Sequence, residues 1–283
     1  MSARAQAFLW RSLVAHALGA GVGIARGERR TPASVRARYD AARQGLLDRL
    51  QMLDWDQYTR LPSDQYGFIL LDGDVVWGSL RTVRDRMLDR LRAVTAAYAC
   101  DGATVVEFGS GDGRNLLFLQ RHFPTVSFVG LELSKVSVEL SRQAAVRFAV
   151  PNVRFHVADV CENLPPLPPH GEVALSFSCF ALEMMPRVFR RAVDNMARAS
   201  SVGLVFLEPV PELWGRDLRG LVSRLRAFQL DRLRGLPRML RQLVCNGAWT
   251  VDVMARSGLG YNPLNEMCEL RLRRVTPSVV SDG

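Results

Sequence analysis

The stretch VVEFGSGDGRN, residues 105–115, decides how the middle of this chain folds. A short apolar run ends at Glu107, and Gly109, Gly111 and Gly113 follow before a helical pattern begins. Glycines permit a tight turn between a strand and a helix, and they let a ligand approach the backbone closely. The spacing is G-x-G-x-G, and Arg114 stands where a dinucleotide fingerprint would place its third glycine. The stretch predicts a ligand-binding turn that departs from the NAD pattern.

An alternation of strand and helix extends from this turn toward the C-terminus. Such an alternation predicts βαβ units, and hence an α/β fold with a doubly wound, mostly parallel sheet. A proline-rich loop is expected over residues 163–169, a helical segment over 218–244 with an interruption near 235–237, and a terminal antiparallel pair of strands over 259–274. The expected strands are TVVEF (104–108), VSFVGLEL (126–133), VRFHVAD (153–159), EVALSFS (172–178) and VGLVFLEP (202–209).

The first third of the chain follows a different pattern. A helix is expected from Thr31-Pro32, a hairpin around Asp72-Gly73, and a further helix from Ser79. We therefore expect a mostly helical N-terminal cap over residues 1–95 and a second unit over residues 96–283. Residues 12–25 have the length of a signal-peptide core, but we interpret them as an amphipathic helix packed on the protein or its ligand.

An acidic residue accompanies the glycine turn. Glu132 lies nineteen residues after Gly113, at the end of the second expected strand. An acid at this place can accept hydrogen bonds from both hydroxyls of a ribose, whereas alone it could equally be a solvated charge. Together with the glycine turn, Glu132 favours binding of a ribose.

The motif series VVEFGSGDG, GLELS, HVADV, ALSFSCFALEMM and VFLEP resembles that of class I S-adenosylmethionine-dependent methyltransferases, over roughly residues 96–283. The resemblance implies a Rossmann-like fold and S-adenosylmethionine as cofactor. It implies that the methionine and sugar are held by Glu107 and by the turn at Gly109, Ser110, Gly111 and Gly113. The ribose would be bound by Glu132, and the adenine would lie against Leu133, with Asp159 and Val160 binding its edge. Ser178 would line the cofactor pocket.

No single catalytic base can be named from the sequence. Methyl transfer has an activated leaving group, so positioning and exclusion of water can supply much of the catalysis. Glu183, Tyr66 and Tyr39 are the candidates, and Glu208, Tyr58, Tyr261, Asn262 and Asn265 are further polar groups near the expected site. For each, a cap, turn or packing role is the competing interpretation.

Charge and cysteine content narrow the partners. The chain carries 37 basic and 28 acidic residues, but residues 100–212 hold 10 and 12, a balance of −2 that suits a cationic cofactor. Ser178-Cys-Phe-Ala differs from the tetrad of nucleobase amino methylators, which argues against nucleic acid as a partner. Five separated cysteines without a C-x-x-C pair favour a reducing compartment, the cytoplasm, and argue against a metal site.

Residues 213–244 hold eight arginines and two aspartates. A helical wheel places most of the arginines opposite a leucine-rich stripe, so we expect a solvated basic face over a packed apolar one. The alternative is a contact surface for an anionic or amphiphilic partner.

The sequence thus predicts a methyltransferase acting on oxygen or nitrogen of a small molecule or modified peptide, in a biosynthetic role. Methylation of a lipid or macromolecule, and a non-catalytic assembly partner with this fold, are the alternatives. The oligomeric state stays open.

Overall fold

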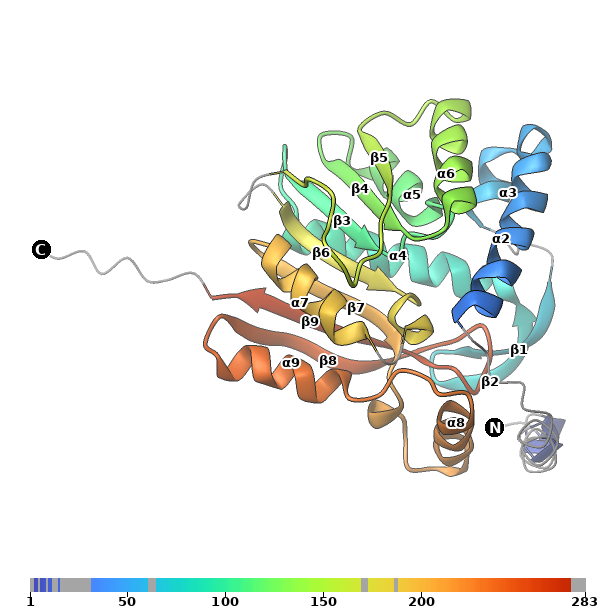
Figure 1. Ribbon diagram of the computed structural model, residues 1–283. Coiled ribbons are helices and arrows are strands. Elements are labelled where there is room, and N and C mark those ends of the chain that lie inside the picture. The colour runs from blue at the N-terminus through green and yellow to red at the C-terminus, as the bar shows by residue number, and fades with distance from the viewer. Residues whose placement is uncertain are drawn as a thin grey trace, which may run out of the picture.

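The computed structural model describes residues 3, 4, 6–8, 10, 11, 15, 32–60, 65–168, 173–185 and 188–275. They form a seven-stranded sheet of order β5-β4-β3-β6-β7-β9-β8 and a separate hairpin, β1-β2 (Figure 1). The strands are β1 (Tyr66–Leu71), β2 (Asp74–Ser79), β3 (Thr104–Phe108), β4 (Ser127–Glu132), β5 (Val153–Val157), β6 (Val173–Cys179), β7 (Gly203–Pro209), β8 (Trp249–Leu259) and β9 (Met267–Arg274). The helices are α2 (Pro32–Asp48), α3 (Trp55–Thr59), α4 (Leu80–Tyr98), α5 (Arg114–His122), α6 (Lys135–Arg147), α7 (Phe189–Ala199), α8 (Leu218–Gln229) and α9 (Leu236–Cys245), with 3-10 turns η1 (Leu50–Met52), η2 (Leu182–Met184) and η3 (Pro211–Leu213).

The sheet has the predicted doubly wound topology. Strands β3 to β7 pair in parallel, whereas β9 runs antiparallel to both β7 and β8. The chain moves outward from β3 through β4 to β5 and then returns to the other side of β3 with β6. Ligands bind outside the carboxyl ends of strands at such a reversal, and the ends of β3, β4 and β6 meet there.

The terminal antiparallel pair is present, but its first strand begins earlier than expected. It covers Trp249–Leu259, whereas the prediction confined the pair to residues 259–274. Residues 260–266 are instead the connection, in which the Asn265 N–H donates to the Asn262 carbonyl at 2.9 Å. The prediction therefore placed a strand on residues that form a turn.

Two apolar layers cover the sheet. Consecutive residues of β3 point to opposite faces, so Val105 packs with α4, α5 and α6 while Val106 packs with α7 and α9. Figure 1 shows α7 and α9 in front of the sheet and α4 and α5 behind it. Because both faces are covered, strands β3, β6 and β7 are buried along almost their whole length, as expected for parallel strands.

The hairpin and α4 connect the first third of the chain to this sheet. The hairpin turns at Asp72 and Gly73, both with positive φ, where the sequence predicted it. Leu70 of β1 exchanges backbone hydrogen bonds with Gly260 at 2.9 and 3.0 Å. The expected division after residue 95 falls within α4 and stays a prediction.

Two of the expectations for the N-terminal region fall on residues that the structure does not describe. Of the segment 12–25, it describes Ala15 alone, and Thr31 lies outside the described residues. The amphipathic helix over 12–25 and the cap at Thr31 therefore stay predictions.

The prediction for the arginine-rich segment is correct for α9 and wrong for α8. In α9, Leu236 and Met239 are buried, as expected, and Leu240 is buried beside them. In α8 the leucines face outward, and the physical reason is an ion pair. Both terminal nitrogens of Arg219 donate to Glu266 Oε2 at 3.1 Å, and both side chains are buried. A helical-wheel prediction assigns arginine to the solvent side because it does not take into account a distant partner such as Glu266. The buried side of α8 carries Arg219, Gly220, Val222, Ser223 and Ala227.

Candidate functional site

The glycine turn between β3 and α5 folds back over the end of β4. The N–H groups of Gly109 and Ser110 both donate to the Leu131 carbonyl, at 2.8 and 3.0 Å, and the Gly113 N–H donates to the Ser110 carbonyl at 3.0 Å. All three glycines of the turn have positive φ, between 56° and 76°. The turn therefore needs the left-handed conformations that glycine adopts without strain.

A side chain would meet different surroundings at each of the three glycines. A Cβ atom at Gly109 would lie 2.4 Å from the Ala181 Cβ, and one at Gly113 would lie 2.7 Å from Phe155 and Ser141. At Gly111 it would meet no atom within 4 Å. Gly109 and Gly113 are thus required for packing inside the protein, whereas Gly111 leaves room for an approaching ligand.

Glu132, at the end of β4, holds the turn in place. Its Oε2 accepts the Gly111 N–H at 3.0 Å, and its Oε1 accepts the Ser134 N–H at 2.8 Å. Each carboxylate oxygen has a second lone pair, and the side chain is only partly buried. Glu132 can therefore support the turn and still accept hydrogen bonds from a diol.

The residues expected around an adenine lie beside Glu132 at the ends of β4 and β5. Leu133 is 44% exposed, which is unusual for a leucine in the middle of a fold and gives a ring system an apolar surface. Asp159 is exposed, and its Oδ1 accepts the Cys161 N–H at 2.9 Å, while Val160 is buried. The structure thus brings to one edge of the sheet the predicted residues Glu107, Gly109, Ser110, Gly111, Gly113, Glu132, Leu133, Asp159 and Val160.

Glu107 lies at the bottom of this edge, in a buried polar network that the sequence prediction missed. Its Oε1 accepts from Asn115 Nδ2 at 2.6 Å, and the Asn115 Oδ1 accepts from Arg84 Nη1 at 2.7 Å. Two atoms of the network have no hydrogen-bond partner among the described residues, Glu107 Oε2 and Arg84 Nη2. One is an acceptor and the other a donor, and a single amide connects their side chains.

Burial dominates the electrostatics of this network. Removal from water raises the pKa of Glu107 to about 8, although the hydrogen bond from Asn115 and the charge of Arg84 oppose the rise. Burial likewise lowers the pKa of Arg84. A buried carboxylate is costly unless a cation or donors accompany it. The site is therefore suited to a ligand that brings a positive group to Glu107.

The signal for Arg84 is present in the sequence. Arg84 is a charged residue on a stripe of α4 whose other positions, Leu80, Met87 and Leu88, are apolar. A charged residue on a core-facing stripe is rarely buried without a partner. Asn115 lies one residue into α5, directly after the glycine turn.

Tyr261 approaches the same network from the turn after β8. Burial raises the pKa of its hydroxyl, and the charge of Arg84 opposes that rise. Its ring also contacts Phe180, with the ring centroids 6.2 Å apart. The turn that joins the terminal strands therefore contributes an aromatic side chain beside Arg84.

The N-terminal helices contact the glycine turn from the other side. The buried hydroxyl of Tyr58 donates to the Asp112 carbonyl at 2.6 Å, and Arg43 lies 3.4 Å from the Asp112 carboxylate. Burial would raise the pKa of Asp112, but Arg114 and Arg43 outweigh it and lower that pKa. On α2, Asp40 also accepts a hydrogen bond from the hydroxyl of Ser134. Helices α2 and α3 thus fix the same turn that the ligand would contact.

The ends of β6 and β7 carry acids that already have partners. Glu208 Oε1 accepts the N–H groups of Ala181 and Leu182 at 2.9 and 3.0 Å, and its Oε2 accepts the Glu183 N–H at 3.3 Å. Burial raises the pKa of Glu208 to about 7, opposed by these backbone donors. Ser178 lies fully buried within β6. Glu208 therefore shapes the turn η2.

The three catalytic candidates lie in different places. Glu183 is buried in η2, where its Oε2 accepts from Arg232 at 2.7 Å and from Asn265 at 3.5 Å. The hydroxyl of Tyr39 lies 3.9 Å from the Met184 sulfur, so α2 meets the same turn. Tyr66 begins the hairpin strand β1 and is 67% exposed. The structure brings Tyr39 and Glu183 to one turn and leaves Tyr66 in the hairpin.

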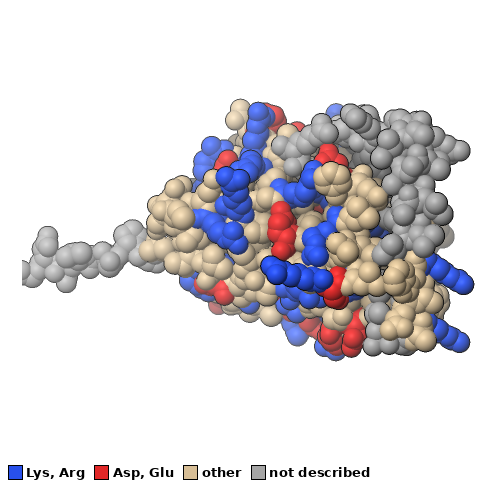
Figure 2. Space-filling view, turned by 90° about the horizontal axis from the view of Figure 1, so that it is seen from below, with Lys and Arg blue, Asp and Glu red and all other residues tan. Residues whose placement is uncertain are grey.

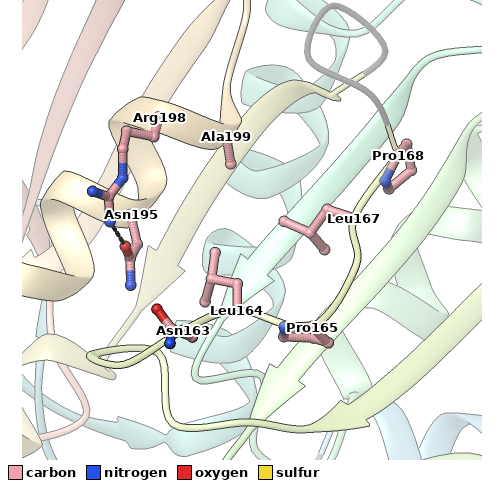
Figure 3. Close-up of a pocket in the computed structure, with 8 residues that line it drawn as sticks. All are labelled: Asn163, Leu164, Pro165, Leu167, Pro168, Asn195, Arg198 and Ala199. Atoms are coloured by element: carbon pink, nitrogen blue, oxygen red, sulfur yellow. Dashed lines mark hydrogen bonds between the residues drawn. The ribbon is translucent and has the colours of Figure 1, made fainter.

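A shallow pocket of about 330 Å³ lies away from the glycine turn. It is formed where the proline-rich connection from β5 to β6 passes α7. Figure 3 shows Leu164 and Leu167 on this loop facing α7, where Asn195 and Arg198 are hydrogen-bonded to each other. Asn195 fixes the loop by donating to the carbonyls of Val160 and Glu162, both at 2.8 Å.

The described residues offer neither a metal site nor a membrane span. Over the described ranges, no group of three or more His, Cys, Asp or Glu side chains could hold a metal ion. No helix in the same part of the chain is long and apolar enough to cross a membrane.

The region that contains the glycine turn and most of the sheet is similar to known methyltransferases. Residues 105–203 match a family model described as a methyltransferase domain. No curated protein matches the sequence. A geranyl diphosphate C-methyltransferase from Streptomyces coelicolor A3(2), crystallised with S-adenosyl-L-homocysteine, matches with a TM-score of 0.53 and 14% identity, over 70% of this chain and 78% of that one.

Two other solved structures, one named as a methyltransferase and one as a cyclase, share the fold. Magnesium protoporphyrin IX methyltransferase from Synechocystis PCC 6803, with bound S-adenosylmethionine, matches with a TM-score of 0.53 and 12% identity, over 82% of this chain and 97% of that one. The [4+2]-cyclase SpnF matches with a TM-score of 0.53 and 17% identity, over 79% and 93%. The family model over residues 105–203 and the sheet topology agree with the motif series, and this part of the chain is a methyltransferase domain with the class I Rossmann-like fold.

Proposed function

We propose that this chain transfers the methyl group of S-adenosylmethionine to an oxygen or nitrogen atom of a small molecule or modified peptide, in a biosynthetic role. The observation that carries the proposal is the edge formed by the ends of β3, β4 and β5. There an open backbone position at Gly111, a diol acceptor at Glu132 and an apolar surface at Leu133 lie side by side.

The residues present fit the cofactor. Its amino-acid end carries an ammonium and a carboxylate, and Glu107 Oε2 and Arg84 Nη2 are a buried acceptor and a buried donor without partners among the described residues. Glu107 and Arg84 would hold that end, Glu132 the ribose, and Leu133, Asp159 and Val160 the adenine. When bound, the cofactor supplies an activated methyl group on a sulfonium centre.

The chain's own contribution is then to position the acceptor and to exclude water. Glu183 is engaged by Arg232, and the carboxylate of Glu208 is engaged by three backbone amides, so neither is set to remove a proton from an acceptor. Oxygen and nitrogen nucleophiles carry a lone pair of their own, and a base is needed only if a proton must leave. Such an acceptor suits this site better than an unactivated carbon.

The solved structures with this fold support a small acceptor. One is named for geranyl diphosphate and another for magnesium protoporphyrin IX, both organic molecules far smaller than a protein. Contacts of α2 and α3 with the glycine turn support a covering role for the N-terminal cap. The free cysteines support action in the cytoplasm, a reducing compartment.

Calorimetry with S-adenosylmethionine tests the cofactor site. Glu132→Ala should weaken binding about tenfold to a hundredfold, because charge-assisted hydrogen bonds to the ribose are lost. Glu139→Ala is the matched control, since Glu139 is an exposed acid on the neighbouring helix α6. Equal affinities of the parent and Glu132→Ala would contradict the proposal. If S-adenosylmethionine binds as expected, measuring the release of S-adenosylhomocysteine with a panel of carboxylic acids, amines and phenols would identify the acceptor.

A further inference from the structure

Helix α8 exposes an apolar stripe on a protein that otherwise buries most of its leucines. Leu218, Leu221, Leu225 and Phe228 are between 37% and 65% exposed. Their spacing of three, four and three residues places them on one face of the helix. The opposite face is fixed to the protein by the buried Arg219–Glu266 ion pair. The stripe is therefore held outward by the fold.

A group of aromatic side chains is connected to α8. Phe8 packs against the cluster of Val222 and Leu264 and also stacks on Phe68, with ring centroids 4.5 Å apart. The Phe68 ring in turn contacts Trp77, which is 65% exposed. Figure 1 shows the hairpin and α8 at the same lower side of the molecule.

Arginine side chains accompany these apolar groups. Of the eight arginines in residues 213–244, Arg219 and Arg232 are paired with Glu266 and Glu183, and Arg234 is paired with Asp231. Arg216, before α8, and Arg238 and Arg241 on α9 are exposed. Figure 2, which views this lower side directly, shows basic side chains across the middle of the face with acidic side chains among them.

We propose that this face, the α8 stripe with its flanking arginines, docks on the surface of a bilayer that contains anionic lipid. Leucine and phenylalanine side chains gain free energy by entering the region below the headgroups, and exposed tryptophan favours the interface. Arginines beside them interact with anionic headgroups. The exposed arginines beside the apolar stripe favour an anionic lipid surface over an apolar protein partner, since an apolar partner would not require basic side chains. The proposal concerns recruitment and does not rest on the proposed acceptor.

Co-sedimentation of the whole chain with vesicles tests the proposal. The protein should bind vesicles of phosphatidylcholine with about 30% phosphatidylglycerol and should not bind pure phosphatidylcholine. Leu221→Glu combined with Leu225→Glu should weaken binding by about tenfold or more, because two charges would enter the apolar region. Val146→Glu is the matched control, since Val146 is 83% exposed on α6, away from this face.

The arginines give a second, independent measurement. Arg238→Gln and Arg241→Gln should each weaken binding to the anionic vesicles about fivefold, and salt at about 0.5 M should weaken it further. Equal binding to neutral and anionic vesicles, or no binding to either, would overturn the proposal. A chain that is dimeric in solution and becomes monomeric in Leu221→Glu would also overturn it, because a second copy would then cover the stripe. Calorimetry with S-adenosylmethionine on the same variants keeps this result separate from the cofactor site.

Discussion

The two halves of the sheet's carboxyl edge use similar residues for different purposes. At the ends of β3 and β4, Glu107 Oε2 has no partner among the described residues and Gly111 has open space around it. At the ends of β6 and β7, Glu208 accepts three backbone N–H groups and Glu183 is paired with Arg232. A buried acid whose hydrogen bonds are complete holds the fold together, whereas one with a vacant lone pair can bind a ligand.

The largest effect should come from Glu208, the acid whose two carboxylate oxygens are both engaged by backbone N–H groups. Glu208→Ala removes the acceptor of three buried N–H groups and should lower the free energy of unfolding by about 3 kcal/mol. Glu208→Gln retains one carbonyl oxygen and should cost less. Urea denaturation measures both values. If Glu208→Ala left stability unchanged but abolished cofactor binding, the two halves would not differ as described.

The glycine turn contains its own version of this comparison. Gly113→Ala places a Cβ atom 2.7 Å from Phe155 and Ser141, so it should lower stability by about 2 kcal/mol. Gly111→Ala meets no neighbour and should cost about 1 kcal/mol for its left-handed backbone, while it weakens S-adenosylmethionine binding by about tenfold or more. Thermal unfolding and calorimetry on the same two proteins separate the effects. An affinity loss confined to Gly113→Ala would reverse the assignment.

Arg84 tests whether the half with vacant groups binds a zwitterion. Arg84→Met should weaken S-adenosylmethionine binding about tenfold, because the carboxylate of the ligand would lose a charge-assisted donor. Decarboxylated S-adenosylmethionine should bind the parent and Arg84→Met equally well. Arg81→Met is the control, since Arg81 lies on the same helix and is paired with Asp56 at 2.7 Å near the surface. Equal losses for both ligands would show that Arg84 only supports the fold.

The smallest effect concerns the pH dependence of stability. The pKa of Glu107 is about 8 in the folded protein and near its ordinary value of 4.5 in the unfolded chain. Between these values the folded state binds more protons, so stability should fall as pH rises, by about 1 kcal/mol per pH unit. Glu107→Gln should remove this part of the slope. Urea denaturation at about pH 6 and about pH 7.5 without ligand measures it, and an unchanged slope would mean that Glu107 stays ionised.

The parts of the site that could be predicted from the sequence are those carried by local spacing. Gly109, Gly111 and Gly113 lie in one short turn, and Glu132 follows at the end of the next strand, so chain order alone places them together. Arg84 lies on a helix before the sheet, and its contact with Asn115 depends on how α4 packs against α5. The N-terminal helices α2 and α3 reach the turn through tertiary packing in the same way.

Helices α8 and α9 show the same limit for the fold. Both helices have a sequence pattern of leucines and arginines, and a helical-wheel projection predicts the buried face correctly only for α9. The face of α8 is decided by Glu266, which lies 47 residues from Arg219 in the sequence and is buried next to β8 and β9. A partner at that separation leaves no periodic signal in the helix itself.

The packing of α4 has a consequence for the smallest part of the chain that can fold independently. Leu88, Leu91 and Val94 belong to the same apolar cluster as Val105 and Phe177 in the sheet. The ring of the last residue of α4, Tyr98, lies within 2.4 Å of the position that a Cβ atom would take at Gly203. A fragment beginning at residue 96 would lack one wall of its core, so we expect an autonomously folding fragment to include the whole of α4.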